Sequence, residues 1–294
     1  MPASHLSLAL VIALVWAVNF VVMKVGLEQL SPFLFITMRF LLAGLLLSPW
    51  LKVVKGRMAH LFLIGLCLGG LHFAVAIMAI HLAEQVSTLV IIVQLHVPFT
   101  LIMAHYFLKE RLSYWRVGGV VLAFFGVMII ALDPAILDER IAIILMLFAT
   151  ALYATGAILT RSLKDVSILT TQAWTAVSGL PLIIGLTLFF EPDPISQLNI
   201  MDLKGWGMVA YAAILSSIVG YGGMNFLLKR HPVTLIAPMM LCVPVFSTVA
   251  AMVFLDEVIT TRFLIGAFIT MSGLGLIHFR DWWRKRRVVK ELLP

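Results

Sequence analysis

Apolar residues run through this chain in long blocks, which are separated by short joints rich in charge, proline and glycine. The blocks show no regular alternation of apolar and polar positions, and this predicts helices rather than the strands of a β-barrel. Each block approaches the ~20 residues that cross a bilayer as a helix. Ten membrane spans are therefore predicted, at 6–26, 33–51, 59–80, 86–107, 114–132, 141–160, 168–190, 206–228, 234–254 and 262–279.

Composition points to the same class of protein. Of 294 residues, 62% are hydrophobic and 12% are charged, and the mean hydropathy is +1.08. Soluble domains hold roughly 45–50% apolar and about 25% charged residues. The first block is expected to be a retained helix, because it lacks the basic start and the cleavage pattern of a signal peptide. We predict an all-α membrane protein with a single integral membrane domain.

The distribution of lysine and arginine predicts how the chain is oriented. Sixteen of the 21 basic residues lie on the side of the two termini, and four lie in the joints on the opposite side. Since cytoplasmic loops are enriched in Lys and Arg, both termini are predicted to be cytoplasmic. The net charge of +7 is concentrated in a tail beside the last span, which favours a contact with anionic lipid over nucleic acid. The tail residues are Arg280, Arg284, Lys285, Arg286, Arg287 and Lys290.

The two halves of the chain resemble each other. A similar segment closes span four and span nine at an offset of 147 residues, and two glycine pairs recur at the same offset. We therefore predict a first five-helix repeat at 1–133 and a second at 134–294. An odd number of spans per repeat gives the repeats opposite orientations, an architecture that recurs in secondary transporters. The matching positions are 107–112 with 254–259, Gly119 with Gly266, and Gly126 with Gly273.

Motifs for other classes of function are missing from the sequence. It contains no phosphate-binding loop, no HExxH and no Cys/His cluster with metal-ligand spacing, so no cofactor and no metal are expected. All fourteen carboxylates fall at span ends or in joints, which argues against an intramembrane enzyme. Cys67 and Cys242 both lie inside spans and are expected to be small packing residues.

A few neutral polar and aromatic residues lie within the predicted spans. Polar groups at this depth are costly unless they are paired or face water, so they mark a cavity or a bond between helices. Both possibilities stay open for each residue, and we take the set as candidate substrate-binding residues. The set is Trp16, Asn19, His72, Gln94, Tyr153, Tyr221 and Asn225.

Three further residues are assigned a structural or gating role. Arg39 is a permanent charge about two turns inside span two, where it could also reach the interface or pair with Glu28. Pro98 in span four and Pro244 in span nine interrupt helices that are related by the repeat.

An ordered set of short motifs resembles the drug/metabolite transporter superfamily, EamA type. Ala17 departs from that pattern, since the family commonly has glycine there. The likeness covers the whole chain. Its motifs are 16–26, Arg39-Phe40, Glu110-Arg111-Leu112, Gly220-Tyr221, Ala237-Pro238, Val243-Pro244-Val245 and Leu255-Asp256-Glu257.

The resemblance implies two inverted five-helix repeats around a central cavity that is lined largely by spans one, three, four, six, eight and nine. It also implies a bacterial inner-membrane exporter of amino acids or related metabolites, working by alternating access. Neutral polar and aromatic groups suit a neutral or aromatic amino acid better than a phosphate. Transport is expected to be facilitated, with proton coupling through His72 as the alternative.

Two other functions stay open. The chain could export other metabolites or drugs, or it could be a non-transporting channel or scaffold subunit. A small-molecule substrate and the lipid bilayer are the expected partners. A monomer is favoured.

Overall fold

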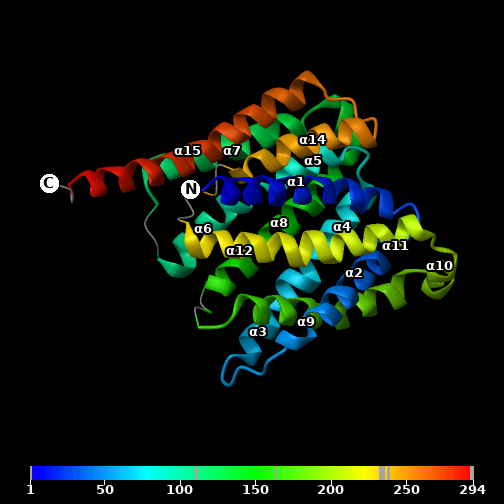
Figure 1. The fold of residues 1–294 in the computed structure, drawn as a ribbon. Coiled ribbons are helices and arrows are strands. Elements are labelled where there is room, and N and C mark those ends of the chain that lie inside the picture. Colours follow the sequence, from blue (N-terminus) through cyan, green and yellow to red (C-terminus); the bar gives the residue numbers. More distant parts are fainter. Residues whose placement is uncertain are drawn as a thin grey trace.

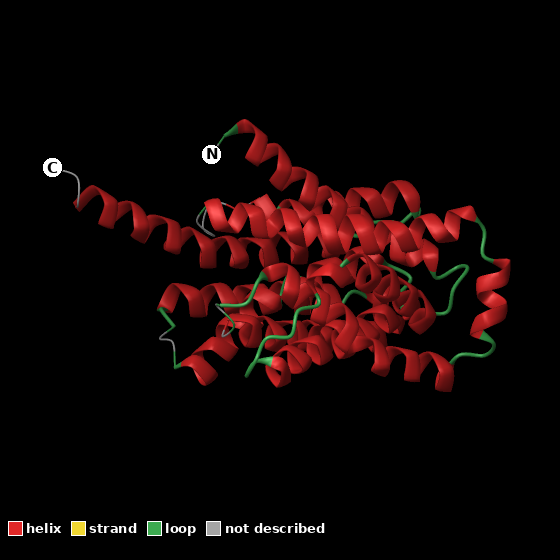
Figure 2. Ribbon diagram, turned by 60° about the horizontal axis from the view of Figure 1, so that its bottom comes forward, coloured by secondary structure: helices red, strands yellow, loops and turns green. Residues whose placement is uncertain are grey.

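The computed structural model describes residues 2–109, 112–161, 163, 165–231, 236 and 239–291. Every regular element in these ranges is a helix (Figure 2). The first half contains α1 (Ala3–Gly26), α2 (Pro32–Leu46), η1 (Ser48–Trp50), α3 (Met58–Ile64), η2 (Gly65–His72), α4 (Phe73–Leu82), α5 (Val86–Val93), α6 (His96–Leu108) and α7 (Tyr114–Ala131). The second half contains η3 (Pro134–Glu139), α8 (Arg140–Arg161), α9 (Ile168–Phe190), α10 (Pro194–Ile200), α11 (Leu203–Ala210), η4 (Tyr211–Gly220), α12 (Tyr221–Arg230), α14 (Cys242–Phe254) and α15 (Thr261–Glu291).

The helices have the length and composition of a membrane protein. Within the described residues, seven helical stretches are long and apolar enough to cross a bilayer: Ala3–Gly26, Met58–Leu82, Val86–Phe107, Tyr114–Ala131, Ile136–Arg161, Ile168–Phe190 and Leu203–Met224. Three further apolar helices are shorter: Pro32–Leu46, Cys242–Phe254 and Thr261–Ile277.

The long helices form one bundle, and both chain ends lie at the same end of it (Figure 1). In this bundle α1 packs against α14 and η4, while α8 packs against α6 and η2. We call the end with the termini the terminal end and the end with α10 the distal end.

Two predicted boundaries differ from the structure. The helix of span two ends at Leu46 rather than near residue 51, because Ser48 precedes Pro49 and the residue before a proline disfavours helix. The last helix continues past residue 279 to Glu291, because nothing between Gly275 and Glu291 breaks it. The 191–202 joint also contains a short helix, α10, that the apolar pattern did not indicate. The start of predicted span nine lies partly outside the described residues.

Several long helices are irregular at corresponding places. A π-helical stretch, η2, interrupts the helix of span three, and η4 interrupts that of span eight. A two-residue turn at Gln94 and Leu95 separates α5 from α6. Such π-helical stretches are rare and occur frequently at functional sites.

Glycine contacts join α7 to α15. A Cβ atom on Gly119 would lie 2.7 Å from the carbonyl oxygen of Gly273, and one on Gly126 would lie 2.5 Å from that of Gly266. Between these contacts, the Thr270 hydroxyl donates to the Ala123 carbonyl at 3.3 Å. The two helices therefore run antiparallel with their backbones in direct contact, as small residues permit in membranes.

Candidate functional site

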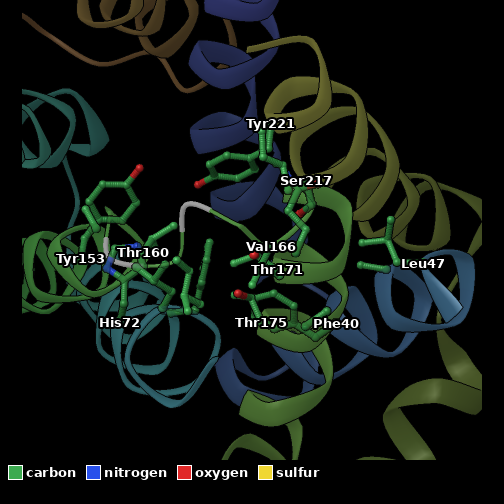
Figure 3. A pocket seen from close by; sticks show the side chains of 18 of the residues that line it. Phe40, Leu47, His72, Tyr153, Thr160, Val166, Thr171, Thr175, Ser217 and Tyr221 are labelled. Carbon is green, nitrogen blue, oxygen red and sulfur yellow. The ribbon is translucent and has the colours of Figure 1, made fainter. Parts of the chain in front are cut away.

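A cavity of about 510 Å³ lies between the two halves of the bundle (Figure 3). Its volume falls within the roughly 300–1,000 Å³ of small-ligand sites. Its walls come from α2, η2, α4, α8, α9, η4 and α12, together with the joint between α8 and α9. The lining therefore comes from spans two, three, six, seven and eight, whereas the resemblance implied spans one, three, four, six, eight and nine. Helix α1 and the described helix of span nine, α14, pack against each other, and α9 forms a wall of the cavity.

Three of the predicted binding residues meet at one end of this cavity. His72, Tyr153 and Tyr221 all line it, and the two tyrosine hydroxyls point toward each other from opposite walls (Figure 3). The His72 ring lies 5.3 Å from the Tyr153 ring, and its Nδ1 donates to the Ala149 carbonyl at 2.8 Å. With Nδ1 engaged, Nε2 is the ring nitrogen that can meet a substrate.

Helix α9 adds a row of polar residues that the sequence analysis did not select. Thr171 and Thr175 are one turn apart and both line the cavity, beside Gln172. Both polar atoms of the Gln172 amide are buried without a hydrogen-bond partner. Leaving such a group unpaired costs about 1–3 kcal/mol, so the Gln172 amide is an unpaired donor and acceptor within the cavity wall, which a substrate would reach after a side-chain rotation. Threonine and glutamine in an apolar helix also serve as contacts between helices, which is why the sequence alone did not distinguish them.

Three other predicted binding residues, Trp16, Asn19 and Gln94, lie outside this lining. Trp16 donates from Nε1 to the Ser216 carbonyl at 3.2 Å and stacks beside Tyr221 with 5.3 Å between ring centroids. Asn19 is buried, and its Oδ1 has no hydrogen-bond partner. Gln94 is buried at the turn between α5 and α6. The side chain of Asn225 lies outside what the structure describes.

The three residues assigned to structure or gating lie in the following places. Arg39 is 1% exposed, so it does not reach the surface, and its guanidinium binds Ser217 rather than Glu28. Pro98 lies in the first turn of α6 and Pro244 in the first turn of α14. A proline is tolerated there, because the first turn needs no backbone N–H.

Charged residues close the distal end around the joint between α4 and α5. Glu257 accepts from the backbone N–H groups of Val86 at 2.5 Å and Ser87 at 3.1 Å, and from the Ser87 hydroxyl. Glu139 accepts from the N–H of Gln85 at 3.2 Å. Lys24 donates to the carbonyl oxygens of Ile80, at 3.2 Å, and Ala83. The joint is thus held by side chains from three other parts of the chain.

A third carboxylate fixes the distal start of α2. Glu191 accepts from the backbone N–H groups of Phe33 at 2.6 Å and Leu34 at 2.9 Å, which are among the N–H groups that a helix leaves free at its start. Burial raises the pKa of the Glu191 carboxyl, and these N–H groups oppose the shift.

The cavity reaches the terminal end of the bundle. Its lining includes Arg161 at the end of α8, Val166 and Ser167 in the joint that follows, and Leu47 just after α2. Ser167 is exposed, while His72 and the aromatic residues lie deeper. The cavity therefore has a mouth at the terminal end and a floor near the middle of the bundle.

Comparison with known proteins identifies the family. The EamA-like transporter family matches residues 3–132 and again residues 140–279. The chain belongs to the EamA-like transporter family. Together with the apolar helices, this makes it a multi-pass membrane protein of a transporter family, and the family and the names of its relatives indicate transporters rather than enzymes.

Two curated relatives cover nearly the whole EamA-like chain. A probable amino-acid metabolite efflux pump of Escherichia coli (strain K12) is 29% identical over 95% of this chain and 96% of its own length. A protein of the same description from Salmonella typhimurium is 30% identical over 96% of this chain and 97% of its own length. A crystal structure matches the fold with a TM-score of 0.65 at 16% identity, covering 94% of this chain and 96% of that chain.

Proposed function

We propose that this protein exports amino acids or closely related small metabolites across the cytoplasmic (inner) membrane. The observation that carries the proposal is a substrate-sized cavity that reaches one end of the bundle and is closed at the other. The efflux-pump relatives support export and the substrate class. Among the described residues no carboxylate lines the cavity, and Arg161 at the mouth is the one Lys or Arg among them that does. The aromatic and neutral polar side chains of the remaining lining suit a neutral or aromatic amino acid.

The proposed architecture is ten spans in two inverted five-helix repeats, with both termini in the cytoplasm. Support comes from the contacts of α7 with α15, because the offset of 147 residues converts the Gly119–Gly273 contact into the Gly126–Gly266 contact. The same offset relates the left-handed backbones of Lys109 and Asp256. A two-fold axis in the membrane plane would produce both correspondences.

The proposed mechanism is alternating access. With a cytoplasmic terminal end, the cavity as it stands would load substrate from the cytoplasm while the contacts of Lys24, Glu139 and Glu257 seal the outer end. Release would require these contacts to break and the terminal mouth to close.

Counterflow in liposomes tests the proposal. Purified protein is reconstituted into vesicles loaded with one of a panel of unlabelled amino acids, and entry of the labelled amino acid is followed. Saturable, counterflow-competent flux is expected, because a carrier must bind its substrate on each crossing. Non-saturable flux would indicate a channel, and no flux of any panel member would contradict the proposed export of amino acids.

Gln172→Ala is expected to weaken substrate binding about 5- to 150-fold, corresponding to the loss of about 1–3 kcal/mol from a buried hydrogen-bonding partner. Because the amide has no hydrogen-bond partner in the structure, the thermal stability of the substrate-free protein should not fall. Half-saturation of counterflow and thermal unfolding measure the two quantities. Asn199→Ala, which removes an exposed amide from α10, is the matched control. Unchanged half-saturation would remove Gln172 from the site.

Flux is expected to run down the substrate gradient without an imposed pH gradient, because no described carboxylate lines the cavity to carry a proton. The measurement compares vesicles with and without a pH difference. Uphill accumulation driven by that difference would contradict facilitated export. Its loss in His72→Ala would then assign the proton to the one histidine that lines the cavity.

A further inference from the structure

Arg39 is a fully buried cation that has no acidic partner among the described residues. Its guanidinium donates to the Ser217 hydroxyl oxygen from Nε at 3.1 Å and from Nη2 at 2.9 Å, and to the Met23 sulfur from Nη1 at 3.6 Å. The ring of Phe73 lies under it at 4.5 Å. A hydroxyl, a thioether and an aromatic face are weak partners for a charge that has lost its water.

The hydrogen bonds described for the guanidinium do not use all of its N–H donors. An arginine has five N–H donors, and three of them meet the acceptors just described. One N–H on each terminal nitrogen has no acceptor in the described part of the chain. A buried charge of this kind is normally neutralised by an anion.

Arg39 adjoins the cavity through three side chains. Three of its neighbours, Phe40, Phe73 and Ser217, line the cavity. Figure 3 shows Ser217 beside Tyr221, on the wall opposite His72. Ser217 therefore both accepts hydrogen bonds from the guanidinium and lines the cavity.

The geometry of this contact matches a carboxylate site. A carboxylate pairs with arginine through two parallel N–H···O bonds along one edge of the guanidinium. Here the single Ser217 oxygen occupies the edge formed by Nε and Nη2. Ser217 belongs to the π-helical stretch η4, and its hydroxyl also donates to the Ala212 carbonyl at 2.9 Å. The hydroxyl therefore has a hydrogen-bond partner other than the guanidinium.

We propose that Arg39 recognises the carboxylate of the substrate, which displaces Ser217 from the Nε–Nη2 edge and neutralises the buried charge. The inference rests on the proposed function and names the part of the substrate that the site requires. It predicts that the negative group is essential, whereas the amino group and the side chain adjust affinity.

Thermal unfolding of the purified full-length protein tests the inference. Three probes share a phenyl ring: L-phenylalanine, 3-phenylpropionate, which lacks the amine, and phenethylamine, which lacks the carboxylate. The first two are expected to raise the unfolding temperature, and phenethylamine is not. Arg39→Gln should weaken binding of both carboxylates at least 10-fold. The control Lys204→Gln, which removes an exposed cation, should leave it unchanged.

Two further variants preserve the test if Arg39→Gln does not fold. Arg39→Lys keeps the positive charge but loses the planar pair of N–H donors, so this variant should bind the carboxylates more weakly than wild type. Ser217→Ala removes the group to be displaced, so carboxylate binding should persist or tighten.

The outcomes separate the two proposals. Equal stabilisation by phenethylamine and L-phenylalanine, or wild-type carboxylate binding by Arg39→Gln, would overturn the role of Arg39 while leaving amino-acid export intact. Stabilisation by chloride in place of gluconate, without any organic probe, would assign the site to a resident inorganic anion and would also overturn it. Absence of binding by every probe, together with no counterflow of any amino acid, would overturn both.

Discussion

Glu257→Gln is expected to open the distal end of the transporter. The carboxylate of Glu257 accepts three hydrogen bonds from Val86 and Ser87. In the glutamine variant an NH2 group replaces one carboxylate oxygen, so a donor faces N–H groups that are also donors. Hydrogen bonds to charged groups contribute about 1.5–3 kcal/mol each. Losing one should therefore raise the population of the distally open state about 10- to 150-fold.

Cysteine accessibility measures this change. Ala83 is 1% exposed and lies in the joint that Lys24 and Glu257 hold, so Ala83→Cys reports on opening. The background would have Cys67 and Cys242 replaced by serine, since both are free thiols. A membrane-impermeant maleimide added outside right-side-out vesicles should label Cys at this position about 10- to 150-fold faster in Glu257→Gln.

The neighbouring carboxylate provides the control for this experiment. Asp256 is exposed, so Asp256→Asn removes a charge one residue away without removing a contact with the joint. Its labelling rate should equal that of the parent protein. Equal rates for the Glu257 and Asp256 variants would show that the Glu257 contacts do not hold the distal end closed. Labelling only from the opposite face would contradict the proposed orientation.

Gly126→Ala is expected to lower the unfolding temperature by several degrees and to reduce the yield of folded protein. A Cβ atom at Gly126 would lie 2.5 Å from both the Gly266 carbonyl oxygen and the Thr270 nitrogen, which are backbone atoms that cannot turn aside. Overpacking of this kind costs roughly 1–3 kcal/mol, more than the ~1 kcal/mol that alanine gains over glycine within a helix.

Gly275→Ala is the matched control, because nothing lies within 4 Å of a Cβ atom at that position on α15. This variant should unfold at the wild-type temperature or slightly above it. Thermal unfolding in detergent, followed for both variants in parallel, measures the difference. If the Gly126 and Gly275 variants proved equally stable, α7 and α15 would not be in backbone contact.

The sequence predicted most of the helices because the bilayer imposes a simple rule. A span must be long and apolar, and that property is visible in composition without any knowledge of packing. The rule does not extend to local irregularity. η2 and η4 are as apolar as ordinary helix, so nothing in their hydropathy distinguishes a π-helical stretch. Helix α10 was not predicted because it is too short and too polar to resemble a span.

The candidate site was predicted less completely, for a different reason. His72, Tyr153 and Tyr221 were selected as rare residues at membrane depth, and the structure gathers them on one cavity. Gln172 was not selected, since its importance depends on which face of α9 packs against η2 and α2 and which face lines the cavity. That arrangement is a property of helix packing, and no local pattern in the sequence encodes it.

The glycine contact between α7 and α15 also constrains how the protein is assembled. Chains insert from the N-terminus during synthesis, so α7 reaches the membrane long before α15 exists. Until then its glycine face, with Gly119 and Gly126, has only lipid to pack against. The first half of the protein therefore remains incompletely packed until the final helix has been synthesised. If synthesis stalled before Thr261, the chain in the bilayer would lack α15, and the glycine face of α7 would be exposed. Other membrane helices or a membrane protease could then bind this face.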